Sequence, residues 1–308
     1  MVSLQVEHTL GRSVTVAARG VSLFVYVYGP QTAQLESPKP YLHPVRTLAG
    51  DVVSLFRPHD HVWHKGIAWS LPNVGEHNFW GGPTYVRGRQ YVQMDNNGSA
   101  VHAAMTALEA SGSTASLAHR LDWRSQRGEP VIAERRALTA TVVDDRSWVL
   151  TFTTAMTNVS GAPLAFGSPT TKGRDNAGYG GLFWRGPRSF TGGLAQSPKG
   201  TGSGDELRGT RAEWFAFRGR HDGTGTASTI VMVDDPANAQ HPPQWFVRTA
   251  EFACLCPAPF FSEELEVAPG QELAFRYAVV VTAGDHGDEG TAALAELGRA
   301  ELGRAALA

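Results

Sequence analysis

The sequence predicts an all-β fold, a large antiparallel β-sandwich with long insertions and a C-terminal helix. Segments in which apolar and polar residues alternate, or in which β-branched and aromatic residues gather, recur along the chain. The 34 glycines and 18 prolines are spread along the chain, as many short connections require. Strand and helix patterns do not alternate, which argues against a doubly wound nucleotide-binding fold.

Eight segments carry the strand pattern, and turn-forming residues separate them. The expected strands cover residues 21–29, 84–95, 114–123, 131–145, 147–158, 212–219, 226–235 and 272–284. Two long stretches, about 37–83 and 167–209, lack this pattern, and ordered stretches of such length are usually functional. The only helical pattern is the segment of about 287–307, rich in Ala, Leu, Glu and Arg. No linker divides the chain, so we expect one domain over residues 1–308.

Composition and charge exclude several partners. Apolar residues make up 42% of the 308 residues and the net charge is −2, which is typical of a globular protein without long-range attraction to nucleic acid or an anionic membrane. No apolar stretch is long enough to span a bilayer, and the first residues lack a signal-peptide pattern. Cys254 and Cys256 are expected to be reduced core residues, consistent with a cytoplasmic protein. A homo-oligomer remains possible.

Five of the eleven histidines gather between residues 43 and 77, around the segment RPHDHVWHKG (57–66). An imidazole titrates near neutral pH, so such a cluster favours acid–base chemistry or metal binding. We expect His61 and His64 to be the acid and base, with Asp60 fixing the tautomer of an imidazole. His43 and Lys65 would complete the charged floor of the site. Alternatively, some of these histidines hydrogen-bond to the loop backbone and hold the insertion in shape.

A metal centre is weakly indicated. His59 and His61 form a His-x-His pair, but the nearest glutamate is Glu76, which is a poor match to the cupin pattern. The chain has neither the HExxH motif nor the cysteine pairs of structural zinc sites. No organic cofactor is therefore expected, while a divalent metal remains possible with unknown ligands.

The remaining polar and aromatic residues of the insertions suggest a sugar site. Sugar sites combine aromatic rings, which stack on the apolar face of the sugar, with polar groups that orient its hydroxyls. The sequence KGRDNAGYGGLFWRGP (172–187) and the segment HPPQWFVR (241–248) contain this mixture. The expected substrate-binding residues are Arg57, His59, Glu76, His77, Trp80, Arg174, Asp175, Tyr179, Trp184, Arg185, His241, Trp245 and Arg248. We expect the two insertions to pack beside each other around one pocket.

In PYLHPVRTLAGDVVSLFRPHDHVWHKG, GEHNFWGG, GYGGLFWRGP and HPPQWFVR, the chain resembles the methane oxygenase PmoA-like family over residues 20–282. The run from Asp60 to Gly66 carries the most specific part, although Trp63 replaces a histidine and Lys65 an arginine of the family pattern. A membrane methane oxygenase needs transmembrane helices, which this sequence does not predict. The family name therefore does not imply methane oxygenase activity for this chain. The all-β pattern is also similar to the galactose-mutarotase-like supersandwich, which implies carbohydrate chemistry.

These observations predict a carbohydrate-processing enzyme that uses histidine acid–base chemistry on a sugar, keto-sugar or glycoside. Isomerase, lyase and hydrolase reactions all remain open. Two alternatives belong to other classes, namely a non-catalytic carbohydrate-binding protein and a metal-dependent, cupin-like oxygenase or isomerase.

Overall fold

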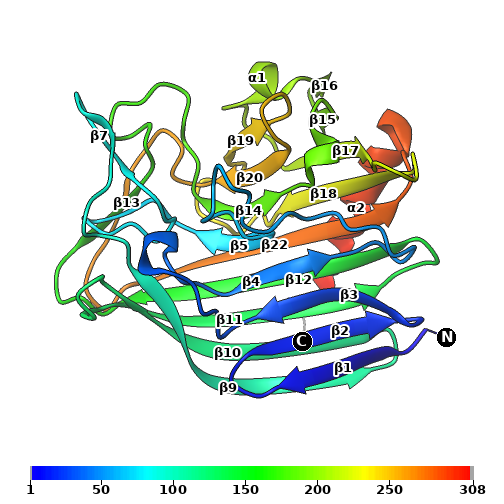
Figure 1. Cartoon of the computed structure of the whole chain (residues 1–308), viewed down its shortest axis with the longest axis horizontal. Coiled ribbons are helices and arrows are strands. Elements are labelled where there is room, and N and C mark those ends of the chain that lie inside the picture. The colour runs from blue at the N-terminus through cyan, green and yellow to red at the C-terminus, as the bar shows by residue number, and fades with distance from the viewer. Residues whose placement is uncertain (1, 306–308) are drawn as a thin grey trace.

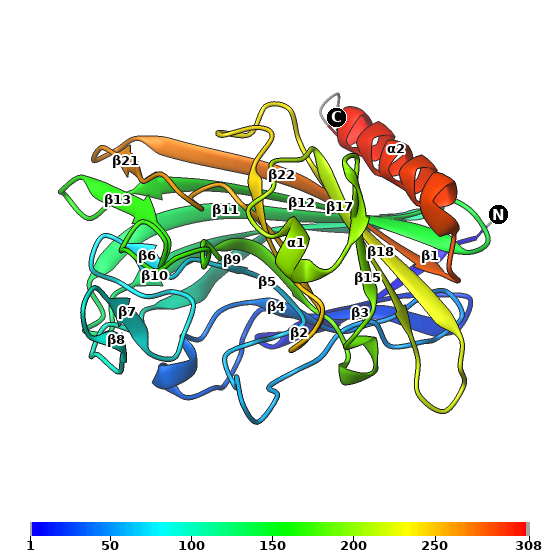
Figure 2. The ribbon, with the colours of Figure 1, turned by 90° about the horizontal axis from the view of Figure 1, so that it is seen from above.

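The computed structural model describes residues 2–305. Two large antiparallel sheets lie face to face (Figures 1 and 2). The eight-stranded sheet contains, in spatial order, β1 (Leu4–Thr9), β2 (Ser13–Ala18), β3 (Val21–Val27), β4 (Tyr41–Val45), β5 (Ile67–Ser70), β14 (Gly181–Arg185), β20 (Cys254–Ala258) and β19 (Gln244–Arg248). The nine-stranded sheet contains β16 (Gly200–Gly202), β15 (Leu194–Ser197), β17 (Trp214–Arg220), β18 (Ala227–Asp234), β22 (Glu272–Ala283), β12 (Ser147–Asn158), β11 (Pro130–Val142), β10 (Thr114–Arg124) and β9 (Ser99–Ser111). The predicted all-β sandwich is confirmed.

Short elements surround the two sheets. Three strands form a small sheet in the order β21 (Leu265–Val267), β13 (Leu164–Gly167) and β6 (Asn73–Val74), and β7 (Thr84–Val86) pairs with β8 (Gln90–Val92). The helical elements are η1 (Gln34–Glu36), η2 (Arg188–Phe190), α1 (Gly204–Leu207) and α2 (Gly287–Ala305). The predicted C-terminal helix is therefore present as α2, and the last residues of its expected span, 306–307, lie outside the described residues.

The core between the sheets follows the two-residue period of the strands. In β2, Val14, Val16 and Ala18 are buried while the residues between them are partly exposed. The nine-stranded sheet contributes large inward side chains such as Phe152 and Tyr277. One side of each outer strand can therefore meet solvent while the other side closes the sandwich.

Helix α2 covers part of the outer face of the nine-stranded sheet (Figure 2). Its residues Leu294, Ala295 and Leu302 pack against Val231 and Val280, which point away from the main core. This second apolar layer explains why β18 and β22 read as continuous apolar runs, since both faces of these strands are buried.

A buried polar cluster crosses the main core. Arg136 pairs with Glu134 at 2.7 Å, and both side chains are almost fully buried. Glu134 also accepts hydrogen bonds from Trp123 Nε1 at 2.6 Å and Thr154 Oγ1 at 2.7 Å. Tyr26 joins this cluster through Arg136. Because its carboxylate accepts several donors, the cluster satisfies charges that would otherwise be costly to bury.

The two stretches predicted to lack strands nevertheless contain several. Residues 37–83 include β4, β5 and β6, and residues 167–209 include β14, β15 and β16. The four residues of β5 and the five of β14 are all buried, so no alternation marks them in the sequence. The expected strand over residues 84–95 is divided into β7 and β8 by a turn. These embedded strands fix the insertions to the sandwich.

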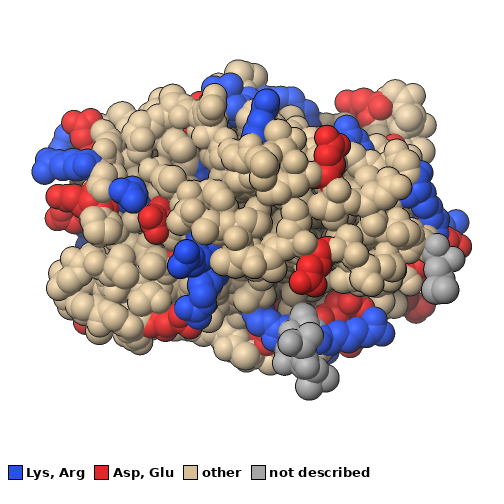
Figure 3. All heavy atoms as spheres, turned by 90° about the horizontal axis from the view of Figure 1, so that it is seen from below, with Lys and Arg blue, Asp and Glu red and all other residues tan. Residues whose placement is uncertain are grey.

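Surface features agree with the low net charge. On the face drawn in Figure 3, acidic and basic side chains are interspersed. This face therefore offers no single-sign area of the kind that binds nucleic acid. Within residues 2–305, no helix has both the length and the apolar character needed to cross a membrane.

Candidate functional site

The candidate site lies on the outer face of the eight-stranded sheet, where β14, β20 and β19 run side by side. In β14, Leu182 and Trp184 point into the main core, so Phe183 and Arg185 point to the opposite side. In β19, Phe246 likewise belongs to the outer apolar cluster, with Arg248 on the same side. These strands therefore present a mixed aromatic and basic surface.

A cavity of about 470 Å³ opens above this surface. Its wall combines seven residues of the first insertion with β8, the outer faces of β14 and β19, and the loops that follow β13 and β19. The lining residues are Asp60, His61, Trp63, His64, Trp80, Gly81, Pro83, Tyr91, Arg174, Tyr179, Phe183, Phe246, Arg248, Glu251 and Phe252. The two insertions thus meet at one pocket, although they are about a hundred residues apart in the sequence.

His61 and His64 form the centre of the polar wall. Two turns, closed by the hydrogen bonds from His61 N to Pro58 O and from His64 N to His61 O, bring the imidazoles to the same side of the chain. Their rings stack with centroids 4.7 Å apart and planes 18° apart. His64 is only 4% exposed, and its Nδ1 has no hydrogen-bond partner within the described residues. His61 is half-buried and its Nδ1 lies 3.1 Å from Asp60 Oδ2.

The environment keeps both imidazoles neutral. Burial lowers the pKa of His64 well below its usual value, and the charges of Arg185 and Arg248 lower it further. Burial also lowers the pKa of His61, but the hydrogen bond and charge of Asp60 oppose this shift. Burial raises the pKa of Asp60, yet the hydrogen bonds from His61 and Arg188 outweigh burial and hold that pKa at about 2. The site therefore contains an ionised carboxylate beside an imidazole that is able to accept a proton.

The aromatic part of the wall is firmly packed. Trp80 lies against Tyr179 with ring centroids 4.6 Å apart, and Tyr179 shares a 2.9 Å hydrogen bond with the hydroxyl of Tyr91. Gly82 has a φ of +68°, and a Cβ at this position would lie 2.7 Å from ring carbons of Trp63. Glycine at position 82 therefore lets the Trp63 ring lie flat against the backbone at the rim of the cavity.

Several residues expected in the site lie outside the cavity. His43 is hydrogen-bonded to Ser54 Oγ at 2.8 Å and stacks on Phe56. Lys65 is buried in an ion pair with Glu36, which also binds Arg57 at 2.8 Å. A buried lysine needs such a partner, so Lys65 and Arg57 hold the insertion in place instead of forming the floor of the site.

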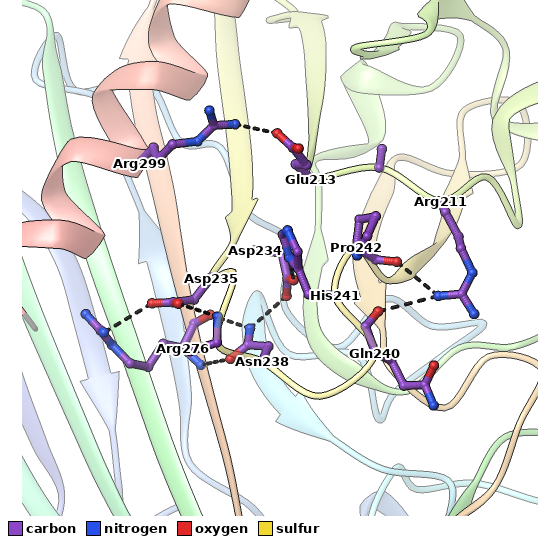
Figure 4. Close-up of polar contacts among 12 residues, drawn as sticks. Arg211, Glu213, Asp234, Asp235, Asn238, Gln240, His241, Pro242, Arg276 and Arg299 are labelled. Carbon is purple, nitrogen blue, oxygen red and sulfur yellow. Dashed lines mark hydrogen bonds and ion pairs between the residues drawn. The ribbon is translucent and has the colours of Figure 1, made fainter.

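Four further residues that were expected in the site, three of them histidines, also have other environments. His59 is exposed and contacts Arg188 Nη2 at 3.1 Å. His77 packs against Phe79, and Glu76 lies beside a separate depression. His241 accepts or donates a 2.7 Å hydrogen bond with the buried Asp234, in a polar cluster around β18 and β22 (Figure 4). These four residues do not reach the cavity.

The structure also corrects the predicted roles of two tryptophans and an aspartate. Trp184 and Trp245 are fully buried in the main core, where their Nε1 atoms donate to Val53 O and Ala212 O at 2.7 Å. Asp175 is exposed and does not line the cavity. In a strand with two apolar faces, the period alone does not indicate which face meets the core. Arg185 lies directly behind the cavity wall, stacked on Phe252.

Sequence reasoning missed most of the apolar lining. Trp63, Pro83, Tyr91, Phe183, Phe246, Glu251 and Phe252 line the cavity without having been expected there. Trp63 lies within the histidine run itself, and Phe246 alternates with Arg248. Both positions in the sequence therefore indicate a residue of the site. Glu251 and Phe252 lie in the turn between β19 and β20, where no periodic pattern marks them.

The donor atoms of the site do not suit a metal ion. In the described part of the chain, no group of three or more His, Cys, Asp or Glu side chains lies close enough to hold one. Here the two imidazoles stack face to face, and Asp60 is already paired with Arg188 at 2.9 Å.

A model of the family described as "Family of unknown function (DUF6807)" matches residues 13–296. This match does not support the resemblance to the methane oxygenase PmoA-like family. No curated protein matches the chain in sequence.

The chain also matches solved structures at low identity. The alpha-galactosidase from Lactobacillus brevis is 11% identical with a TM-score of 0.41; the match covers 92% of this chain, which spans 40% of that enzyme. The galactose 1-epimerase from Lactobacillus acidophilus NCFM is 8% identical with a TM-score of 0.38, and the match covers 91% of this chain and 97% of that one. A GalM/aldose epimerase homologue from C. elegans is 9% identical with a TM-score of 0.30, and the match covers 92% of this chain and 100% of that one.

Proposed function

We propose that this chain, which belongs to the family of unknown function DUF6807, binds a sugar in the cavity and moves a proton on it with His61 and His64. The observation that carries the proposal is the stacked pair of imidazoles in the cavity wall, one of them held by Asp60. A neutral imidazole accepts a proton near pH 7 and the imidazolium that forms gives it back, as isomerisation and elimination reactions of sugars require.

The shape and lining of the cavity support a sugar as the ligand. Trp63, Trp80 and Tyr179 offer aromatic surface on which the apolar face of a sugar ring stacks. Its volume of about 470 Å³ falls in the usual range for small-molecule sites. Burial raises the pKa of Tyr179 well above its usual value, so its hydroxyl stays protonated and able to hydrogen-bond to ligand oxygens.

Within this proposal, His61 is the general base. Asp60 fixes the ring by its contact with Nδ1, which leaves Nε2 as the atom that takes the proton. Asp60 also stabilises the imidazolium that forms. His64 lies beneath His61 and stays neutral because it is buried among positive groups. Its role is to hydrogen-bond through its N–H to the sugar oxygen where negative charge develops, while the imidazolium of His61 returns the proton.

Hydrolysis is the least favoured of the three reaction classes. Glycosidases usually need one carboxylic acid that remains protonated near neutral pH. The carboxylates of the cavity are Asp60 and Glu251, and each is paired with an arginine. Burial raises the pKa of Glu251, but the hydrogen bond from Arg248 outweighs burial and lowers it. Neither carboxylate is thus suited to be the acid, which favours an isomerase or a lyase.

A non-catalytic carbohydrate-binding protein is the second candidate, because the aromatic wall alone would bind a sugar. NMR of the purified protein with free aldoses, 3-keto-sugars and glycosides separates the candidates. Anomeric exchange, epimerisation or elimination that stops in the His61→Ala variant supports the proposed enzyme. Line broadening of a sugar without any new product supports the binding protein. Absence of both effects over the whole panel overturns the proposal of a sugar site.

A further inference from the structure

Arg185 carries a buried charge without a carboxylate beside it. Its side chain is 1% exposed, and both Nε and Nη1 lack a hydrogen-bond partner within residues 2–305. Its guanidinium instead lies over the ring of Phe252, with Cζ 3.8 Å from the ring centroid. Burial accordingly lowers the pKa of Arg185 to about 10, which still leaves it charged at neutral pH. An uncompensated buried cation is costly, so it indicates an anion that the chain itself does not supply.

Phe252 is surrounded by basic groups. Besides Arg185, the guanidinium of Arg248 lies 5.5 Å from its ring centroid, and the rings of His61 and His64 lie 5.6 and 5.7 Å away. This side chain therefore marks the point of the cavity wall where the charges of Arg185 and Arg248 lie beside the two neutral imidazoles. The proposed base and the basic groups share that point.

The acidic groups of the cavity already have arginine partners other than Arg185. Asp60 is paired with Arg188, and Glu251 is paired with Arg248 at 2.6 Å. Arg174, in contrast, donates to the neutral hydroxyl of Tyr91 and stacks on its ring at 4.8 Å. Once these pairs are counted, the charges that remain around the cavity, those of Arg174 and Arg185, are both positive.

We propose that the sugar bound in this cavity is an acidic one, whose carboxylate binds Arg248 in place of Glu251 and lies within the field of Arg185. This inference rests on the proposed function and adds the substrate class to it. The side chain of Glu251 is 54% exposed, so its pair with Arg248 contributes little and exchanges readily. The guanidinium fork suits a planar carboxylate, and the group now bound to it is itself a carboxylate.

Binding of three related probes tests the proposal. Isothermal titration calorimetry compares glucuronate, glucose and glucose 6-phosphate, which differ only in the group at carbon 6. We expect glucuronate to bind at least about tenfold more tightly than glucose, the usual effect of one charge-assisted hydrogen bond, with an affinity that falls as salt is added. Tighter binding of the phosphate than of the carboxylate would overturn the choice of carboxylate.

Two variants act in opposite directions on the same ion pair. Arg248→Gln removes the cation and should lower glucuronate affinity about tenfold or more, with little effect on glucose. Glu251→Gln removes the competing carboxylate and should raise glucuronate affinity. The Arg299–Glu213 pair, also 2.6 Å apart but on α2 and beside β17, provides matched controls, since Arg299→Gln and Glu213→Gln should change neither affinity. Because Glu251 is exposed, its variant remains informative even if Arg248→Gln fails to fold.

The outcomes separate this inference from the proposed function. Equal binding of glucuronate and glucose, or a Glu251→Gln variant without a gain in glucuronate affinity, would overturn the acidic substrate while leaving a sugar site intact. Failure of every sugar to bind would overturn the proposed function itself. Arg185→Met adds an independent readout, because loss of this cation should raise the pKa of His61 in an NMR titration, and an unchanged pKa would remove Arg185 from the site.

Discussion

The imidazole rings of His61 and His64 stack at 4.7 Å between centroids, yet the two rings lie in different surroundings. His61 faces the cavity beside an ionised carboxylate, whereas His64 is buried beneath it among arginines and aromatic rings. The same residue type is thereby given two environments, because Asp60 opposes the lowering of the His61 pKa, whereas every neighbour of His64 lowers its pKa. Unequal environments of this kind allow two chemically identical groups to serve as base and donor.

The first prediction compares two histidines of the same cluster. His61→Ala should lower turnover by about 100-fold or more, the usual effect of a positioned acid or base, and should change the melting temperature little. His43→Ala is the control, because His43 lies outside the cavity and is half-buried against Ser54 and Phe56. It should lower the melting temperature while turnover per folded molecule stays unchanged. Equal turnover in both variants would contradict the assignment of His61 as the base.

The second prediction concerns the tryptophans. Trp63→Ala should weaken sugar binding about tenfold, because an aromatic stacking surface at the rim of the cavity is lost. Trp184→Ala should instead cost about 3–5 kcal/mol of stability, since it leaves a hole in the main core. Calorimetric titration and urea unfolding measure the two quantities. A stable Trp184→Ala variant with weakened binding would place Trp184 in the site after all.

The third prediction tests the buried ion pair. Glu134→Gln removes the charge that compensates Arg136 and should lower the free energy of unfolding by about 3–5 kcal/mol. Replacing both residues, as Glu134→Gln with Arg136→Met, should cost less than Glu134→Gln alone, because no buried charge is left without a partner. Urea unfolding of the two variants gives the comparison. A double variant less stable than the single one would show that the pair itself is favourable.

The fourth prediction follows from His119. Burial, and then the charge of Arg136, lowers the pKa of His119 to about 2 in the folded protein. The unfolded chain binds this proton below a pH of about 6.5, so the contribution of His119 to stability is complete above that pH and is lost as the pH falls towards 2. The loss should be about 1.4 kcal/mol for each pH unit.

Replacing His119 by Gln should remove this part of the pH dependence between pH 6 and pH 4, as followed by urea unfolding at each pH. His286→Gln serves as the control, since His286 lies next to α2, away from the buried cluster. The same slope in the His119→Gln variant as in the unaltered protein would show that His119 is protonated in the fold.

The sequence predicted the sandwich, and it placed His61 and His64 in one insertion, but it did not predict which strand faces form the cavity wall. Alternation shows that Trp184 and Leu182 share a face and that Arg185 and Phe183 share the other. Both faces of β14 are apolar and buried, so the pattern is symmetric and does not tell which face meets the core. The expected roles of Trp184 and Trp245 failed for this reason. The bend between His61 and His64 follows from their three-residue spacing, because side chains at that spacing do not converge on an extended strand.

The charged residues show a second limit of prediction from the sequence. Lys65 and Arg57 carry the same signal as a catalytic residue, namely charge beside histidine in an insertion. Only the fold shows that both converge on the carboxylate of Glu36, which is 29 residues before Lys65. Pairing at such distances in the sequence depends on how the strands are arranged, and a local motif contains no information about it.

The position of β14 has a consequence for the synthesis of the chain. This strand lies between β5, which precedes it by more than a hundred residues, and β20, which follows it by about seventy. The cavity wall therefore does not exist on the ribosome until residues up to Ala258 have emerged and paired. Contacts of such long range make slow folding the expectation. Ligand binding by nascent chains halted at successive lengths should accordingly begin only after β20 has emerged, so that binding reports completion of the eight-stranded sheet.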